Sequence, residues 1–415
     1  MNAVRNYMLV TGAYWAFTLT DGALRMLVLL HFHELGYTPV QLAFLFLFYE
    51  FFGVVTNLLG GWLASVAGLR VTLLGGLALQ VLALVMLALA NSTWPMATSV
   101  AYVMAAQSLS GIAKDLTKMS AKSTLKLLVP EHARSSLFKW VAILTGSKNA
   151  LKGVGFFLGG LLLSVIGYAH SLYAMAGALG LVLIGMTLSL PGELGKSRGK
   201  SKFKGLLSKT REVNLLSLAR FFLFGARDIW FVVGVPVFLS VNLGWSFTEV
   251  GTFLALWVIG YGVVQSGAPA LISRWTGGQA PDGRAAQVLA FMLAAVTAAI
   301  AAGLSAGLTP ELVVLGGLTL FGLVFAINSS VHSYLILAYS DGDKVAMNVG
   351  FYYMANAGGR LVGTLLSGVL FQFGGVAGCL WASAAFAAAT GVISLLLPHK
   401  GSALLMAEMK AEGAD

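Results

Sequence analysis

Residues 191–213 read PGELGKSRGKSKFKGLLSKTREV and form the only long polar interruption in an otherwise apolar chain. The segment holds seven Lys or Arg against two Glu, and its Gly, Ser and Lys content is typical of a flexible linker. It lies near the middle of the 415 residues and leaves an apolar block on either side. We therefore predict two halves, 1–190 and 214–397, joined by a basic linker and followed by a tail at 398–415.

The composition places both halves in a lipid bilayer. Hydrophobic residues make up 58% of the chain and charged residues only 10%, with a mean hydropathy of +0.85. A soluble protein carries about 25% charged residues, so this chain has too few charges to cover a water-exposed surface. Its long unbroken apolar runs predict helices, since the strands of a membrane barrel alternate apolar and polar residues. The predicted fold class is an all-α membrane protein.

Twelve apolar runs are long enough for transmembrane helices, which need about 20 residues each. They cover residues 6–33, 39–66, 70–90, 94–118, 137–167, 170–190, 214–241, 247–272, 285–307, 311–338, 346–373 and 377–397. Six runs precede the linker and six follow it, which predicts two six-helix halves. The first run is too long for the apolar core of a signal peptide, so we expect an uncleaved anchor.

The distribution of Lys and Arg predicts the orientation of the chain. Cytoplasmic loops of membrane proteins carry an excess of these residues. Placing the linker in the cytoplasm puts six further basic residues there: Arg70, Lys122, Lys126, Arg134, Arg274 and Arg284. The loops on the opposite face then carry no Lys or Arg. We therefore expect both termini in the cytoplasm.

A shift of 208 positions aligns the two halves with each other. It pairs Leu35-Gly36 with Leu243-Gly244, and Lys152 with Arg360. It also pairs three more glycines of the first half with glycines of the second: Gly155, Gly160 and Gly167 with Gly363, Gly368 and Gly375. Repeats in the same membrane orientation occur in transporters that bind a solute between two halves near the bilayer midplane. The pattern predicts pseudo-symmetric halves with a solute site between them.

Charged residues inside the predicted helices form the candidate site. A charge near the bilayer centre costs about 2.5–3.5 kcal/mol, so it faces a cavity or a partner. Near mid-depth the bases outnumber the acids: Arg25, Lys148, Lys152, Arg227 and Arg360 against Asp21, Glu50 and Asp228. Lys148 and Lys152 lie four apart on one helical face, where like charges repel unless an anion compensates them. We predict a site for a small, multiply charged anion such as a phosphate or arsenate ester.

Other polar residues extend this candidate site. Lys114, Asp115 and Lys118 end the fourth predicted helix, and they either belong to the site or reach water at its cytoplasmic mouth. Asn356 is expected to hydrogen-bond the solute or another helix. For Asp21 with Arg25, and for Asp228, the alternative is an ion pair that only joins helices.

Proton coupling requires a carboxylate that takes up and releases a proton. Glu50 has no base at helical spacing within its own predicted helix, so it is the first candidate. The other candidates are Asp21, Asp228 and Asp115.

The sequence offers no sign of enzyme chemistry. No P-loop, H-E-x-x-H or G-x-S-x-G motif occurs. The single cysteine, Cys379, allows neither an intramolecular disulfide nor a multi-thiolate metal site. We expect no cofactor, no metal and no nucleic-acid partner, and a lipid bilayer as the surroundings.

The chain resembles the major facilitator superfamily. Residues 60–74 read GGWLASVAGLRVTLL and are similar to that superfamily's loop signature between the second and third helices. Gly61, Gly68 and Arg70 match the signature, while Ser65 stands where the family usually has Asp. The resemblance implies twelve transmembrane helices in two pseudo-symmetric six-helix halves, and transport by alternating access.

Four stretches resemble ArsJ-type organoarsenical efflux permeases: TDGALRMLVLLHFHELGY (20–37), SGIAKDLTKMSAKS (110–123), SKNALKGVGFFLGG (147–160) and FLFGARDIW (222–230). This resemblance implies export of 1-arseno-3-phosphoglycerate across a bacterial inner membrane and resistance to arsenate, with proton coupling expected from the acidic candidates above. It also implies glyceraldehyde-3-phosphate dehydrogenase as the functional partner that supplies the solute. The alternatives are an organophosphate/phosphate exchanger of the same superfamily and a membrane receptor that transports nothing.

Overall fold

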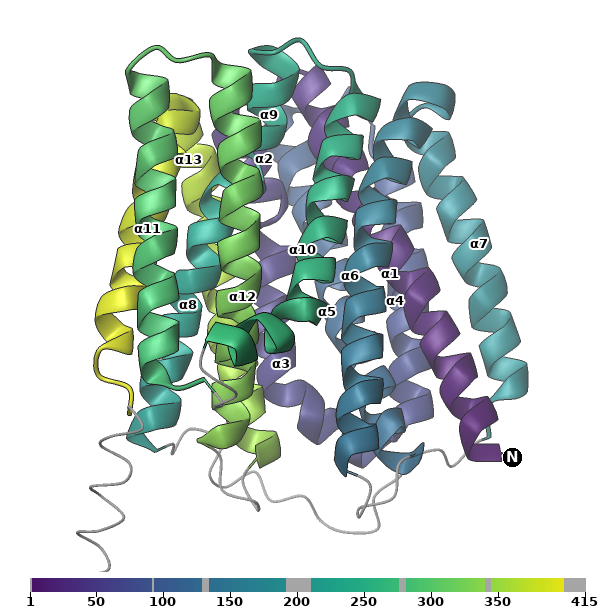
Figure 1. The fold of residues 1–415 in the computed structure, drawn as a ribbon. Helices are drawn as coiled ribbons and strands as arrows, with labels where there is room; N and C mark the ends of the chain where they lie inside the picture. The colour runs from purple at the N-terminus through teal and green to yellow at the C-terminus, as the bar shows by residue number, and fades with distance from the viewer. Residues whose placement is uncertain are drawn as a thin grey trace, which may run out of the picture.

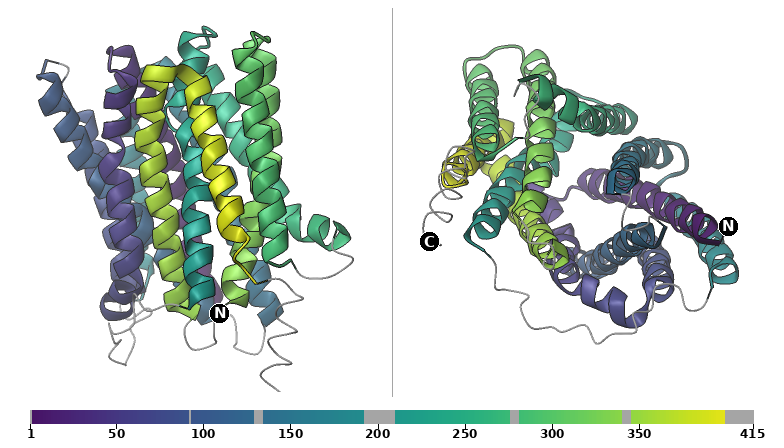
Figure 2. Two further views of the ribbon diagram at one scale, coloured as in Figure 1. Left: turned by 90° about the vertical axis from the view of Figure 1, so that its left-hand side faces the viewer. Right: turned by 60° about the horizontal axis from the view of Figure 1, so that its bottom comes forward.

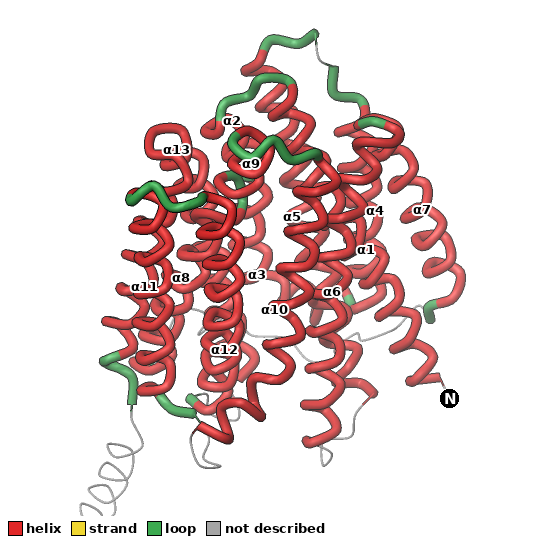
Figure 3. The backbone as a smooth tube through the Cα atoms, turned by 45° about the horizontal axis from the view of Figure 1, so that its top comes forward, coloured by secondary structure: helices red, strands yellow, loops and turns green. Residues whose placement is uncertain are grey.

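A computed structural model of the chain describes residues 2–91, 93–128, 134–191, 210–275, 281–339 and 345–398. Within these ranges every regular element is a helix, which confirms the all-α fold class (Figure 3). Residues 192–209 of the predicted linker and 399–415 of the predicted tail lie outside the described residues, as do the side chains of Lys122, Lys126 and Arg134.

The first half makes six passes along the bundle (Figure 1). They are α1 (Asn2–Glu34), α2 (Pro39–Leu45) continuing into α3 (Leu47–Ala67), α4 (Leu69–Ala88), α5 (Met96–Leu128), α6 (Arg134–Ile166) and α7 (Tyr168–Ser189). Thr38 caps α2 by accepting a hydrogen bond from the Gln41 backbone, and the Gln41 side chain accepts one from the Thr38 backbone. This capping box and Pro39 at the first helical position define where the second pass begins.

The second half also makes six passes. They are α8 (Arg211–Phe231) continuing into α9 (Gly234–Val241), α10 (Phe247–Trp275), α11 (Gly283–Ser305), the π-helical turn η1 (Leu312–Gly316) leading into α12 (Gly317–Ala338), and the two arms of α13 (Val345–Ser394). The arms meet at Gly375, whose backbone leaves the helical region at φ 59° and ψ −163°.

By length and composition, nine segments of the described chain are able to cross a membrane. One of them, Asn348–Ser394, contains both arms of α13. The helices α1 and α5 are not among the nine. Both carry charged residues of the candidate site in their middle parts, which lowers their hydropathy. The order of passes agrees with the predicted arrangement of six and six.

Three helix boundaries differ from the prediction. The fourth pass continues to Leu128 instead of ending at 118, because good helix formers follow and the next proline comes only at 130. The second pass is broken at Phe46. The seventh pass is broken between Phe231 and Gly234. Pro236 lies four residues after the start of this break and has no N–H to continue the helical hydrogen bonds.

The repeat seen in the sequence has a structural counterpart. Gly36 and Gly244, which the shift of 208 pairs, both adopt a left-handed backbone, with φ of 84° and 69°. Gly167 and Gly375 also form such a pair, with φ of 74° and 59°. Residues with a Cβ rarely adopt this conformation, so glycine is needed at equivalent turns of both halves. The agreement supports a pseudo-symmetric repeat.

Close packing of six helices around the centre positions the candidate site. The helix α6 packs on α1 in its own half and on α10 across the halves, while α13 packs on α8 and, across the halves, on α3. Glycines allow these contacts. A Cβ on Gly22 would lie 2.6 Å from the Lys152 carbonyl oxygen, and one on Gly363 would lie 2.8 Å from the Gly225 carbonyl oxygen. Figure 2 shows the two halves side by side, with the linker ends at one face of the bundle.

Candidate functional site

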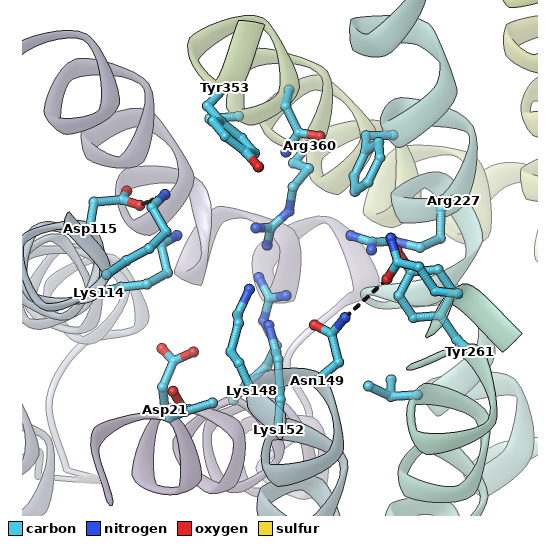
Figure 4. A pocket seen from close by; sticks show the side chains of 18 of the residues that line it. Asp21, Lys114, Asp115, Lys148, Asn149, Lys152, Arg227, Tyr261, Tyr353 and Arg360 are labelled. Atoms are coloured by element: carbon cyan, nitrogen blue, oxygen red, sulfur yellow. Dashed lines mark hydrogen bonds and ion pairs between the residues drawn. The ribbon is translucent and has the colours of Figure 1, made fainter. Parts of the chain in front are cut away.

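A cavity of about 190 Å³ lies between the two halves. Its wall is formed by α1, α3, α5 and α6 of the first half and by α8, α10, α12 and α13 of the second. All eight predicted solute-binding residues line it: Arg25, Lys114, Lys118, Lys148, Lys152, Arg227, Asn356 and Arg360. Figure 4 shows Lys148 and Lys152 extending from α6 toward Arg360 on α13.

The predicted acidic residues are divided between the cavity wall and the layer behind it. Asp21 and Asp115 line the cavity. Glu50 and Asp228 are fully buried and form ion pairs with bases that line it. Eight bases line the cavity, and even against all four carboxylates they leave a formal excess of four positive charges.

Glu50 is the centre of an ion-pair network. Its Oε1 accepts hydrogen bonds from Arg25 Nη2 at 2.7 Å and Arg360 Nη2 at 2.5 Å. Lys114 Nζ lies 4.0 Å from the other carboxylate oxygen, Oε2. These bases come from α1, α13 and α5, so helical spacing within α3 could not reveal them. Proton uptake by Glu50 would therefore be tied to the loss of two strong ion pairs.

The network continues into the second half through Asp228. Arg360 Nε donates to Asp228 Oδ2 at 3.0 Å, and Arg227 Nε donates to Asp228 Oδ1 at 2.6 Å. Arg360 thus connects a carboxylate of α3 with a carboxylate of α8. Because Glu50 belongs to the first half and Arg360 to the second, their ion pair joins the two halves.

The remaining acids have other partners. Tyr49 Oη donates to Asp21 Oδ1 at 2.6 Å. Arg25 pairs with Glu50, so the Asp21–Arg25 ion pair considered from the sequence is not formed among the described residues. Lys118 pairs with Asp115 one helical turn away, and Lys118 Nζ also donates to Asn57 Oδ1 at 2.6 Å.

One cavity base was not among the predicted site residues. Arg220 on α8 is 4% exposed, lines the cavity, and donates from Nε to Asn356 Oδ1 at 2.9 Å. It also donates to the backbone and hydroxyl oxygens of Ser329, both at 3.1 Å. Among the described residues no carboxylate lies within 4.0 Å of Arg220. In the sequence, Arg220 precedes Phe224 by four positions and Arg227 by seven. This spacing puts the three side chains on one face of a helix and is the sequence signal that Arg220 faces the same cavity as Arg227.

Contacts between the halves close one end of the bundle. The Val40 backbone N–H donates to Gln372 Oε1 at 3.3 Å, and the hydroxyl oxygens of Ser164 and Thr248 lie 3.2 Å apart. The rings of Phe156 and Phe231 line the cavity, with centroids 6.0 Å apart, and Phe156 lies between Lys152 and Ser164 along α6. The closed end is opposite the N-terminus and the linker ends (Figure 1).

The fold and the cavity define a class of protein: a multi-pass membrane carrier with a polar chamber between two repeated halves. Residues 10–278, well over half of the chain, match the family model of the Major Facilitator Superfamily, and the chain belongs to that superfamily. Its structure is similar to a crystal structure of a POT family transporter in complex with a thioalcohol conjugated peptide. The TM-score is 0.69 at 13% identity, and 94% of each chain is covered. No match is found among curated proteins.

The superfamily's loop signature has a structural role here. Gly68 begins the turn into α4 with φ 88°, a conformation that favours glycine. Arg70 Nη2 donates to the Thr187 carbonyl oxygen of α7 at 2.8 Å. The signature thus ties the start of α4 to the last turn of α7, within the first half.

Proposed function

We propose that this transporter moves a small, multiply charged organic anion through the central cavity. The observation that carries the proposal is the formal excess of four positive charges around a cavity of about 190 Å³. Drug-sized ligands occupy pockets of about 300–1,000 Å³, so this volume suits a smaller solute. Uncompensated cations in a low-dielectric site are costly, and an anionic solute offsets that cost.

The mechanism is alternating access by rocking of residues 1–190 against 214–397. The anion enters from the linker end and competes with Glu50 and Asp228 for the guanidinium groups of Arg25, Arg227 and Arg360. A displaced carboxylate is then available to a proton from the opposite side. Proton uptake by Glu50, with Asp21, Asp115 and Asp228 as the further candidates, keeps the carboxylate from recapturing the arginines and couples proton entry to export.

The solute we propose is 1-arseno-3-phosphoglycerate, supplied by glyceraldehyde-3-phosphate dehydrogenase in the cytoplasm. Its pentavalent arsenate ester is recognised as an oxyanion and needs no thiolate ligands. This suits a chain whose single cysteine, Cys379, is buried in α13 outside the cavity wall. We place the transporter in a bacterial inner membrane, and the basic linker supports a cytoplasmic location for both termini. The transporter would then confer resistance to arsenate.

One observation favours a second candidate, an organophosphate/phosphate exchanger. Glu50 already has two guanidinium partners, so anions alone can exchange at these arginines without any proton. Such an exchanger would show counterflow with phosphate and no dependence on a proton gradient.

Everted membrane vesicles test the proposal. Vesicles that contain the protein are supplied with labelled arsenate, glyceraldehyde 3-phosphate, NAD and the dehydrogenase, with and without a proton gradient. We expect arsenic to accumulate inside only with the complete mixture, and faster with the gradient. Equal accumulation without the dehydrogenase, or none in vesicles with folded protein, would refute the proposed solute. Accumulation of labelled phosphate esters against internal phosphate would establish the exchanger.

A further inference from the structure

Two cations of the cavity wall, Lys152 and Arg220, have no carboxylate within ion-pair distance among the described residues. Lys152 Nζ has neither a hydrogen bond nor an ion pair with any described residue, and it lies over the Phe156 ring, 5.6 Å from the centroid. Within the described part of the chain, the side chain of Arg220 donates hydrogen bonds only to neutral groups. The other guanidinium groups of the wall, those of Arg25, Arg227 and Arg360, each have a carboxylate partner.

Hydrogen bonds hold the guanidinium of Arg220 in a fixed orientation. Three hydrogen bonds, from Nε to Asn356 and from Nη1 to Ser329, define the plane of its guanidinium. The plane lies over the Phe224 ring, with Cζ 3.9 Å from the centroid. These contacts use Nε and Nη1 and leave Nη2 without a hydrogen bond among the described residues, on a side chain that lines the cavity. A fixed guanidinium edge of this kind suits a carboxylate or phosphate group.

Lys152, on α6 of the first half, presents a different kind of cation to the same cavity. Its backbone is fixed, because Gly22 packs directly against its carbonyl oxygen. Its side chain extends from α6 into the cavity, beside Lys148 (Figure 4). An ammonium on a flexible stem acts as a point charge and accepts an anionic group in several orientations.

The two cations belong to different halves but to one continuous polar wall. Asn149, on the same face of α6 as Lys152, donates across the halves to Gln265 Oε1 at 3.2 Å. Gln265 Nε2 lies 3.5 Å from Ser329 Oγ, and the same Oγ accepts from Arg220 at 3.1 Å. A solute along this wall meets a cation at each end and hydrogen-bonding groups between them.

We propose that the transported solute carries an anionic group at each end, one bound by Lys152 of the first half and the other by Arg220 of the second. The inference rests on the proposed transport of a small organic anion and specifies its shape. A solute with two anionic ends compensates both cations and ties the halves together around itself. A solute with one anionic end leaves one of these two cations uncompensated, so it binds more weakly.

Binding to the purified full-length protein in detergent tests this inference, with two three-carbon probes. The first, 3-phosphoglycerate, has a phosphate and a carboxylate at its two ends, whereas glycerol 3-phosphate has a hydroxyl in place of the carboxylate. We expect the wild-type protein to bind 3-phosphoglycerate at least about tenfold more tightly, as expected for one added charge-assisted contact. Of Arg220→Gln and Lys152→Gln, the variant that loses the carboxylate-binding cation should remove this advantage, whereas the variant that loses the phosphate-binding cation should weaken both probes.

The variants give a signature that general damage to the site would not produce. Both substitutions should weaken 3-phosphoglycerate binding about tenfold or more, but only one of them, at the subsite that holds the phosphate, should weaken glycerol 3-phosphate. Arg220→Lys and Lys152→Arg should retain binding in part. Arg284→Gln, at an exposed base of α11, is the matched control and should change neither affinity.

The outcomes separate this inference from the proposed function. Equal affinity of the wild-type protein for both probes overturns the two-ended solute, and 1-arseno-3-phosphoglycerate with it, but leaves transport of a small organic anion standing. Equal weakening of both probes by both variants overturns it as well. If folded wild-type protein binds neither probe, the inference and the proposed function fail together. The wild-type comparison needs no variant, so it decides the question even if the substitutions disturb folding.

Discussion

Neutralising Glu50 should destabilise the transporter, because Glu50 is the carboxylate shared by both halves. In Glu50→Gln, Arg25 loses its only carboxylate partner among the described residues, whereas Arg360 retains Asp228 at 3.0 Å. Removing one partner of a buried ion pair costs about 3–5 kcal/mol. We expect a loss at the lower end of this range, about 3 kcal/mol, because the rings of Phe46 and Tyr49, with centroids 5.3 Å from Arg25 Cζ, still stabilise that guanidinium.

Thermal unfolding of the purified protein in one detergent measures this loss. With an unfolding entropy of about 2.1 cal/mol/K per residue, a loss of about 3 kcal/mol lowers the Tm by about 3 °C for a chain of this length. The matched control is Glu34→Gln, which removes an exposed carboxylate at the end of α1 and should leave the Tm unchanged. If Glu50→Gln unfolds at the wild-type temperature, or above it, the ion-pair network does not stabilise the fold as we argue.

Three further predictions concern packing, backbone and access. Gly22→Val should lower the Tm, because a Cβ at Gly22 would lie 2.6 Å from a carbonyl oxygen of α6 and overpacking costs about 1–3 kcal/mol. The control is Gly12→Val, which has open space around it and should lower the Tm less. Gly244→Ala should destabilise the protein by about 1 kcal/mol because φ is 69°, and an unchanged Tm would contradict the left-handed turn. The native hydroxyl oxygens of Ser164 and Thr248 lie 3.2 Å apart across the halves, so cysteines at both positions should form a disulfide on oxidation. Oxidation of this double variant should stop transport, and a reductant should restore it. Undiminished transport by the oxidised, cross-linked protein would argue against rocking.

The helical architecture follows from the sequence because lipid leaves few alternatives. A spanning segment must satisfy its own backbone hydrogen bonds, so long apolar runs become helices. The glycine pairs of the repeat are informative because a left-handed turn selects glycine at Gly36 and again at Gly244. The break at Phe46 could not be foreseen, because neither glycine nor proline marks it; the break before Gly234 has a signal in Pro236.

The sequence predicts which charged residues line the cavity better than it predicts which of them form ion pairs. The cost of a charge in lipid predicts that Lys152 and Arg360 face a cavity, and both line it. The partners of Glu50 come from three other helices, and spacing along α3 contains no information about them. Arg220 lies inside the seventh predicted helix, but it is closer to the linker than Arg227 and was not counted among the mid-depth bases. In the structure α8 directs it inward to Asn356 and Ser329.

The central claim is that a small organic anion crosses the membrane through the cationic cavity between the halves. Transport into vesicles that contain a cavity variant tests this claim most directly. Everted vesicles with equal amounts of wild-type protein, Lys152→Gln or Arg284→Gln are given labelled arsenate with the complete dehydrogenase mixture. The account predicts that wild type and Arg284→Gln accumulate arsenic at similar rates, while Lys152→Gln loses nearly all accumulation although it folds and inserts. Accumulation by Lys152→Gln at the wild-type rate would contradict it.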